Sequence, residues 1–213
     1  MQIRKFRHSC LHVTDGDASV LIDPGSFSRG YDTLTGLTAV LVTHAHADHL
    51  HPDGLARVLA ANPDARVYAD TDSVAQLAEH PATSGAPVTA VRPGDVLDVG
   101  TRVEVSGGRH AVIHADIPVV PNVCYLIGGT LFHPGDSLVA PTAPVPVLAL
   151  PVAAPWMAVK EAVDYLRSVE PQRVIPIHEQ VFAVPAMAYR IVSSLAPAGT
   201  TWTDIDDGSV VDL

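Results

Sequence analysis

Three histidines and one aspartate lie within six residues of one another in the segment His44-Ala45-His46-Ala47-Asp48-His49. Neutral imidazole and carboxylate groups are ligands that suit zinc, and also iron or manganese. Four such groups are costly to bury without a partner, and a bound cation removes that cost. The spacing therefore predicts a metal site in this segment.

The elements around the cluster must hold these side chains together. Residues 39–42, directly before it, form a short apolar run typical of a buried strand, and loops at the carboxyl ends of such strands commonly build sites. Further strands are predicted at residues 3–6, 9–13, 18–22, 65–69, 96–99, 102–106, 123–127, 130–132, 173–177 and 209–211. Helical spacing predicts a helix that ends at Asn62, one introduced by Pro155 and one opened by Pro185. This order favours an α/β fold of two mixed sheets with helices outside.

Composition and charge exclude several classes of function. The chain has 213 residues, 47% hydrophobic and 17% charged, which fits one globular domain spanning 1–213. Its net charge of −10, with only Lys5 and Lys160 as lysines, leaves no cationic stripe for nucleic acid. We therefore expect a small-molecule substrate, and the oligomeric state stays open, a homo-oligomer included.

Two further features bear on the cellular setting. Cys10 and Cys124 lie in apolar segments predicted as strands, so buried free thiols are expected rather than a disulfide framework. The first residues show no signal-like apolar core, and no run of about 18 apolar residues occurs. We expect a cytoplasmic protein with no membrane partner.

The chain resembles the metallo-β-lactamase superfamily over nearly its whole length. The motifs that carry the resemblance, in family order, are Leu21-Ile22-Asp23-Pro24, the cluster at 44–49, His110, Gly135-Asp136-Ser137 and Pro176-Ile177-His178. The resemblance implies a four-layer αββα sandwich of two mixed β-sheets with helices outside, and a site for two divalent metal ions. Zinc is the expected ion, with manganese or iron as alternatives.

The resemblance also implies a role for each matching residue. His44, His46 and His110 would hold one ion, and Asp48, His49 and His178 the other, with Asp136 touching both. Asp23 would support the ligand loop without binding metal. A metal-bound hydroxide would be the nucleophile, and the ions would polarise the substrate oxygen. Asp48 is also a candidate catalytic residue.

Shorter patterns are similar to the short zinc-dependent hydrolases related to L-ascorbate-6-phosphate lactonase. These patterns are His8-Ser9-Cys10, Asp116-Ile117-Pro118, Asn122-Val123-Cys124-Tyr125 and Pro176-Ile177-His178. They indicate a subgroup and leave the substrate open.

Several residues keep alternative interpretations. His114 follows His110 by four residues, so either could be the third ligand of the first ion; the family order favours His110 and leaves His114 as a candidate catalytic or substrate-binding group. His8 would lie beside the ligands only if the first hairpin folds over the site. His133 would orient Asp136 or be a plain strand-end histidine.

Other residues near the motifs are expected to be structural or solvent-facing. Glu179 is expected to face solvent, because a metal-bound hydroxide already supplies the nucleophile. Trp156 and Met157 are expected to anchor a helix to the core. Arg29 and Arg109 are the cations expected nearest the mouth of the site, with plain surface positions favoured.

Three function classes remain in view. The first is hydrolysis of an ester, lactone or phosphoester bond in a small molecule. The second is a di-iron redox protein of the same fold, since the same ligand types can hold iron. The third is a non-catalytic metal-binding protein, which the complete set of candidate ligands disfavours.

Overall fold

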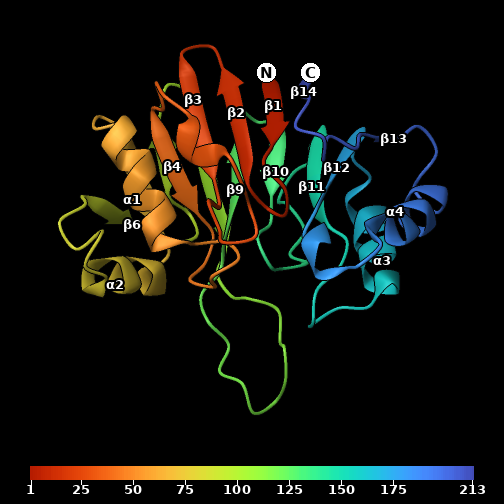
Figure 1. Ribbon diagram of the computed structural model, residues 1–213. Coiled ribbons are helices and arrows are strands. Elements are labelled where there is room, and N and C mark those ends of the chain that lie inside the picture. The colour runs from red at the N-terminus through yellow and green to blue at the C-terminus, as the bar shows by residue number, and fades with distance from the viewer.

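The computed structural model describes residues 1–213 and contains two seven-stranded sheets (Figure 1). The first sheet has the order β14-β1-β2-β3-β4-β5-β6. Its strands are β1 (Gln2–Lys5), β2 (Leu11–Asp15), β3 (Ala18–Ile22), β4 (Ala39–Val42), β5 (Arg66–Ala69), β6 (Val88–Ala90) and β14 (Val210–Asp212). Pairing is parallel from β3 to β6 and antiparallel in the β14-β1-β2-β3 portion. This sheet is therefore mixed.

The second sheet has the order β13-β12-β11-β10-β9-β8-β7. Its strands are β7 (Val96–Asp98), β8 (Arg102–Gly107), β9 (Val123–Ile127), β10 (Leu131–His133), β11 (Val147–Pro151), β12 (Arg173–Ile177) and β13 (Thr201–Trp202). Pairing is antiparallel from β7 to β10 and parallel from β10 to β13. Both sheets are thus mixed, as the sequence predicts.

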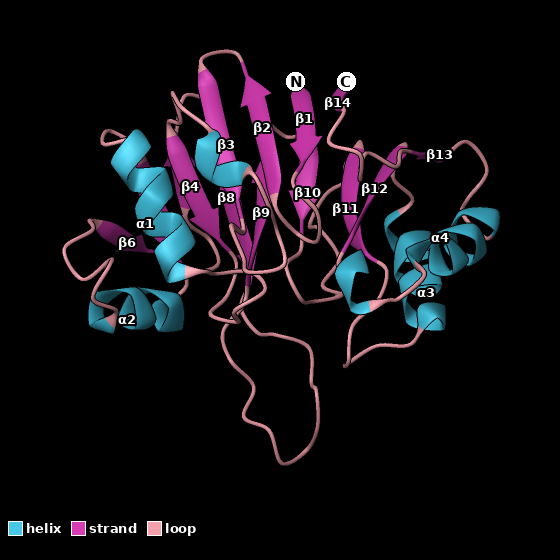
Figure 2. Cartoon of the chain, in the orientation of Figure 1, coloured by secondary structure: helices cyan, strands magenta, loops and turns pink.

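Helices cover the outer faces of the two sheets (Figure 2). They are α1 (Pro52–Ala61) and α2 (Thr71–Glu79) on one side, and α3 (Val159–Val169) and α4 (Pro185–Ser194) on the other; short 3-10 turns are η1 (Tyr31–Thr33) and η2 (Glu179–Val181). One buried cluster fills the space between the sheets, and two others lie between each sheet and its helices. The four-layer sandwich is confirmed.

Strand β4 shows why the sequence folds this way. All four of its residues are buried, because it is an inner strand with the other sheet on one side and helices on the other. Its near-continuous apolar composition is the pattern expected for such a strand. The predicted helix that ends at Asn62 is confirmed as α1, which buries Leu55 and Val58.

Two predicted boundaries are wrong for local reasons, and one helix was not predicted. Helix α3 begins at Val159 rather than at Pro155, because the Glu161 carboxylate accepts the Ala158 N–H at 2.6 Å and fixes the start there. Strand β2 begins at Leu11, since Arg7 and His8 have left-handed backbones that end β1 in a tight turn. Helix α2 was not predicted, and it buries only Ser73 and Leu77.

Two expectations about the chain as a whole can be compared with the structure. Cys10 and Cys124 are buried free cysteines, as predicted. None of the helices has both the length and the apolar character needed to cross a bilayer.

Candidate metal centre

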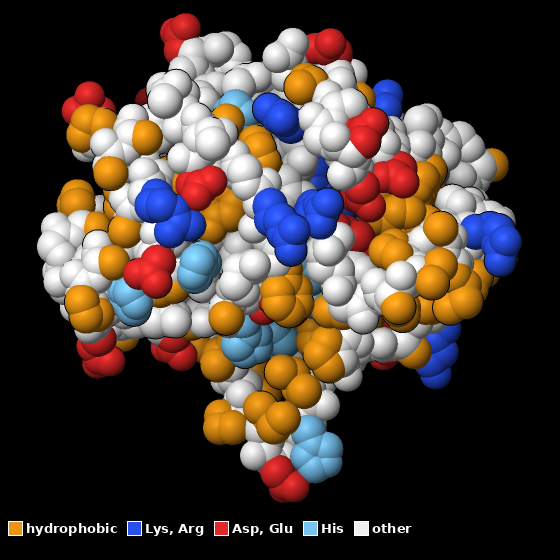
Figure 3. Space-filling model, in the orientation of Figure 1, with side chains coloured by type: hydrophobic (Ala, Val, Ile, Leu, Met, Phe, Trp, Pro, Cys, Tyr) orange, Lys and Arg blue, Asp and Glu red, His pale blue; other side chains and the backbone are white.

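The candidate ligands come from loops that follow strands of both sheets. The His44–His49 segment follows β4, Asp136 follows β10 and His178 follows β12, whereas His110 lies in the long loop after β8. That loop, residues 108–122, projects from the body of the protein in Figure 1. Histidine side chains gather at its base in Figure 3, beside hydrophobic side chains. The fold thus collects residues far apart in sequence at one edge of the sandwich.

The side chains form two groups, and within each group the potential ligand atoms lie within 4.8 Å of one another. One group is His44, His46, His110 and Asp136; the other is His8, Asp48, His49 and His178. Asp136 joins the groups, because its carboxylate oxygens lie 3.0 Å from His49 Nε2, 3.1 Å from His178 Nε2 and 3.2 Å from His110 Nε2. All seven predicted ligands are brought together, and His8 lies with them; their role as ligands stays a prediction.

Asp23 fixes the ligand loop from behind, in the supporting position that the resemblance implies. It is fully buried, and its Oδ1 accepts the Thr43 backbone N–H at 2.8 Å. Its Oδ2 accepts the Thr43 hydroxyl at 2.8 Å and lies 2.7 Å from His49 Nδ1. This contact orients the His49 ring so that Nε2 faces the cluster.

Gly25 lets the ligand loop fold closely over the preceding segment. A Cβ on Gly25 would lie 1.8 Å from the carbonyl oxygen of Asp48, so no other residue fits without moving the loop. The neighbouring backbone also binds the loop, because Ser26 N–H donates to Ala47 O at 2.8 Å. Residues 23–26 therefore set the path of the ligand loop as well as supporting His49.

Asp136 is oriented by contacts that the sequence did not reveal. Its backbone N–H donates to Asn122 Oδ1 at 3.0 Å, and the Trp156 indole N–H donates to its Oδ2 at 2.9 Å. The expectation that Trp156 only anchors a helix is wrong. Trp156 lies before the start of α3, and its side chain donates a hydrogen bond to the Asp136 carboxylate. His133 does not contact Asp136; it accepts the Gly135 N–H and binds Ser9 O, which fixes the turn before Asp136.

The donor atoms of the cluster suit cations. Buried atoms without a hydrogen-bond partner include His44 Nε2, His49 Nε2, Asp136 Oδ1 and both ring nitrogens of His178. Orphaned buried polar groups are rare in proteins, and here they converge in one place. Imidazole nitrogens and carboxylate oxygens are the donor set of zinc, iron and manganese sites, so the residues present fit such ions.

The electrostatics of the cluster agree with this fit. Burial lowers the pKa of His44 well below its ordinary value, which keeps the ring neutral, as metal binding requires. Burial opposes ionisation of Asp136, but His49 and His178 hold its pKa below the usual range. Burial also lowers the pKa of His178, yet Asp136 and Asp48 raise it to about 9. A cation that binds beside His178 therefore displaces a proton.

His114 is not brought into the cluster. Its side chain is 64% exposed on the projecting loop, and its Nδ1 accepts the Asp116 N–H at 3.1 Å. It belongs to neither group of potential ligands, whereas His110 belongs to one, so the structure does not bring His114 to the cluster and its catalytic role stays a prediction. The spacing of four residues from His110 does not bring His114 to the cluster, because residues 110–114 form an irregular loop rather than a helical turn.

Glu179 also differs from its prediction. It is fully buried rather than solvent-facing, and it pairs with Lys5 at 2.6 Å. Of the arginines expected near the mouth, Arg29 lies beside Arg4 and Arg7 in a surface depression of about 420 Å³, which also contains Asp206 and Asp207. Arg109 is exposed and forms no ion pair.

Comparison with known proteins places the chain in a family. A family model described as a beta-lactamase superfamily domain matches residues 2–178. The chain belongs to the metallo-β-lactamase superfamily. The ligand loop, Asp136 and His178 all lie inside the matched region. It is an enzyme of the metal-dependent hydrolase class.

Curated relatives cover most of the chain. Protein Rv0786c of Mycobacterium tuberculosis is 47% identical over 192 residues, which is 87% of each chain. The UPF0173 metal-dependent hydrolase PF1764 of Pyrococcus furiosus is 29% identical over 192 residues, covering 80% of this chain and 81% of the relative. These relatives therefore support the family likeness over most of the chain.

Solved structures share the fold. Igni18, a metallo hydrolase from Ignicoccus hospitalis, superposes with a TM-score of 0.72 at 21% identity, covering 99% of this chain and 97% of that one. CmlA, a diiron β-hydroxylase from Streptomyces venezuelae, gives 0.73 at 16% identity and covers 100% of this chain but 54% of its own. At these identities the likeness concerns the fold alone.

Proposed function

We propose that this protein hydrolyses an ester, lactone or phosphoester bond of a small molecule with the help of two divalent cations, zinc being the expected ion. The observation that carries the proposal is the pair of side-chain groups joined by Asp136, with buried ligand atoms that lack hydrogen-bond partners. The proposal includes the likeness to short zinc-dependent hydrolases related to L-ascorbate-6-phosphate lactonase, which rests on sequence patterns.

In this proposal the two groups of side chains hold one cation each. His44, His46 and His110 would hold one cation, Asp48, His49 and His178 the other, and Asp136 both. When bound, the cations lower the pKa of a water molecule and polarise the substrate oxygen. Asp23 and Trp156 hold His49 and Asp136 in place. Such orientation of the ligands is what allows the site to act without rearranging during the reaction.

Asp48 is the candidate for moving protons to and from solvent. Its side chain is 21% exposed, whereas that of Asp136 is 3% exposed. The hydrogen bond and ion pairs of the Asp48 carboxylate, with His8, His49 and His178, all involve Oδ2, so Oδ1 is the oxygen that would accept a proton from an incoming water. Burial opposes ionisation, but the nearby His178 and His8 rings hold the pKa of Asp48 below its usual range.

The rim of the site suggests the character of the substrate. On the projecting loop, Val112 is 62% exposed and Ile117 is 45% exposed. Phe27 is also 45% exposed, and its ring packs against that of His8 with the centroids 5.1 Å apart. Apolar side chains around a polar centre favour a small molecule with an apolar portion beside the reacting group. The acidic net charge of −10 disfavours nucleic acid.

A di-iron redox protein is the second candidate, because the same donor set suits iron and the diiron enzyme CmlA shares the fold. Elemental analysis of the purified protein, together with a panel of ester, lactone and phosphodiester substrates, separates the two. About two zinc or manganese ions per chain with hydrolysis would support the proposal. About two irons without hydrolysis would replace it with the redox function, and absence of metal after reconstitution would overturn both.

The variant Asp136→Ala connects this result to the site. Because Asp136 lies between both groups, we expect the variant to lose at least one ion and its hydrolysis. Asp64→Ala, which alters an exposed aspartate after α1, is the matched control and should behave as wild type. Unchanged metal content and activity in Asp136→Ala would remove Asp136 from the site.

A further inference from the structure

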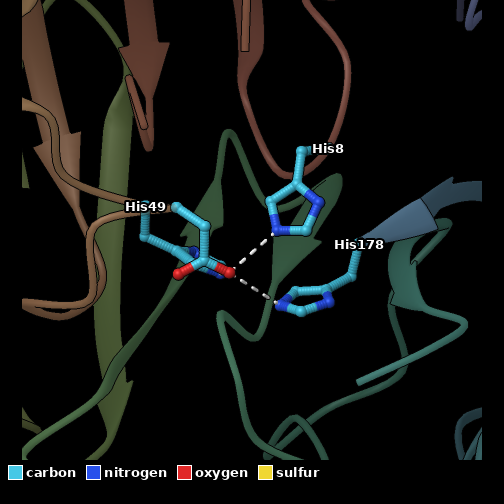
Figure 4. Close-up of side chains that lie close together, drawn as sticks. His8, His49 and His178 are labelled. Carbon is cyan, nitrogen blue, oxygen red and sulfur yellow. Dashed lines mark hydrogen bonds and ion pairs between the residues drawn. The ribbon is translucent and has the colours of Figure 1, made fainter. Parts of the chain in front are cut away.

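His8 lies inside the second group of potential ligands, although it is not among the seven residues of the family pattern. Its side chain is fully buried, and its Nε2 lies 3.0 Å from Asp48 Oδ2. The ring centroid is 4.1 Å from that of His178 and 5.6 Å from that of His49. In Figure 4, dashed lines join the His8 and His178 rings to the same carboxylate oxygen, which is Asp48 Oδ2.

His8 is placed with respect to Asp48 much as His178 is. His178 Nε2 approaches the same Oδ2 at 3.4 Å, compared with 3.0 Å for His8. In both residues the Nδ1 atom is buried without a hydrogen-bond partner. The two rings differ in that His178 Nε2 also lies 3.1 Å from Asp136 Oδ2, but they share their approach to Asp48 and a buried Nδ1 without a hydrogen-bond partner.

The backbone is built to hold His8 in this position. Arg7 and His8 adopt left-handed conformations, with φ of 66° and 50°, which cost about 1–3 kcal/mol each in residues other than glycine. The His8 N–H donates to Glu179 Oε1 at 2.8 Å, and Glu179 in turn pairs with Lys5. A histidine that only filled space in the core would gain nothing from so constrained a turn.

We infer that His8 is a further ligand of the cation held by Asp48, His49 and His178, so that this site draws on four residues of its own besides Asp136. The inference rests on the proposed function. The competing role is that His8 only donates a hydrogen bond to Asp48. The two roles differ in what the side chain must offer, since a ligand needs an imidazole lone pair and a donor needs only an N–H.

The variant His8→Gln separates these roles, because its amide can still donate to Asp48 but is a far weaker ligand. Wild type, His8→Gln and the control His80→Ala are freed of metal and titrated with zinc against a chromophoric chelator. His80 lies at the end of α2, outside both groups. We expect the dissociation constant of one zinc to rise about 100-fold or more in His8→Gln only, at the upper end of the 10–100-fold range for partners of ligands.

A variant-free measurement covers the case in which His8→Gln fails to fold. Wild type with ¹⁵N-labelled histidine is loaded with ¹¹³Cd, and imidazoles that show ¹¹³Cd–¹⁵N coupling are counted. Six coupled rings, namely His8, His44, His46, His49, His110 and His178, are expected. Five coupled rings without His8, or unchanged zinc affinities in His8→Gln, would overturn the inference and leave the proposed function standing. A wild type that binds no zinc would overturn the proposed function itself.

Discussion

Lys5 holds the two sheets together directly behind His8 and His178. It is 1% exposed, and its Nζ lies 2.6 Å from Glu179 Oε2, 2.5 Å from Asp206 Oδ1 and 2.6 Å from Pro176 O. Lys5→Met keeps the length of the side chain but leaves Glu179, 0% exposed, as a buried carboxylate without its cation. Removing one partner of a buried ion pair costs about 3–5 kcal/mol.

That cost converts into a measurable shift in melting temperature. For a chain of this size, 1 kcal/mol corresponds to about 2–4 °C, so Lys5→Met should melt about 6–20 °C below wild type. Thermal unfolding of the metal-free proteins, followed by circular dichroism, measures the shift. The only other lysine provides the control: Lys160→Met, at an exposed position, should change stability by no more than about 0.5 kcal/mol.

A second variant tests the reason for the loss. In Lys5→Met combined with Glu179→Gln, the buried negative charge at Glu179 is gone while an oxygen acceptor for His8 N–H is kept. The double variant should therefore be more stable than Lys5→Met alone, because the unpaired charge is the main penalty. A Lys5→Met protein that melts with wild type, or a double variant less stable than the single one, would refute this reasoning.

Three further changes test individual contacts of the site. Trp156→Phe removes the N–H donated to Asp136 and keeps an aromatic ring at this position, and we expect zinc affinity to fall about 10-fold in the chelator competition; an unchanged affinity would make that contact incidental. Asp23→Asn removes the charged acceptor for His49 Nδ1 and should weaken zinc binding about 10–100-fold, with stoichiometry at high zinc kept. His114→Ala should keep the zinc content and melting temperature of wild type, and loss of one zinc would reinstate His114 as a ligand.

Features that depend on neighbours in sequence were predictable. Four candidate ligands lie within residues 44–49, directly after the apolar strand β4, so their proximity required no knowledge of the fold. The order of strands and helices likewise determined the layers. Helix α2 was not predicted, because it buries only Ser73 and Leu77, which are too few to give a periodic apolar face in the sequence. The start of α3 was wrong because Pro155 signals a first helical turn, whereas the cap that forms is at Ala158.

Contacts between distant segments were not predictable in the same way. His8 N–H and Glu179 are separated by 171 residues, and Lys5 and Asp206 by 201. Glu179 was expected in solvent because no catalytic role was needed for it, and its buried partner Lys5, 174 residues away, was not visible from the sequence. Trp156 could have been suspected only as an aromatic residue with a donor group that must find an acceptor when partly buried.

The backbone adds a constraint on the site that residue types do not reveal. Five residues other than glycine have positive φ, and four of them, Arg7, His8, Asp23 and His178, lie in or beside the cluster. Such conformations persist only where surrounding contacts hold them, and here the holding contacts are buried polar ones: Asp23 with Thr43, and His8 with Glu179. Glycine at His8, Asp23 or His178 would relieve the strain but remove a side chain that belongs to the cluster or supports it. The site therefore depends on the polar contacts behind it, and the Lys5–Glu179 pair belongs to its architecture although it offers no atom to a cation.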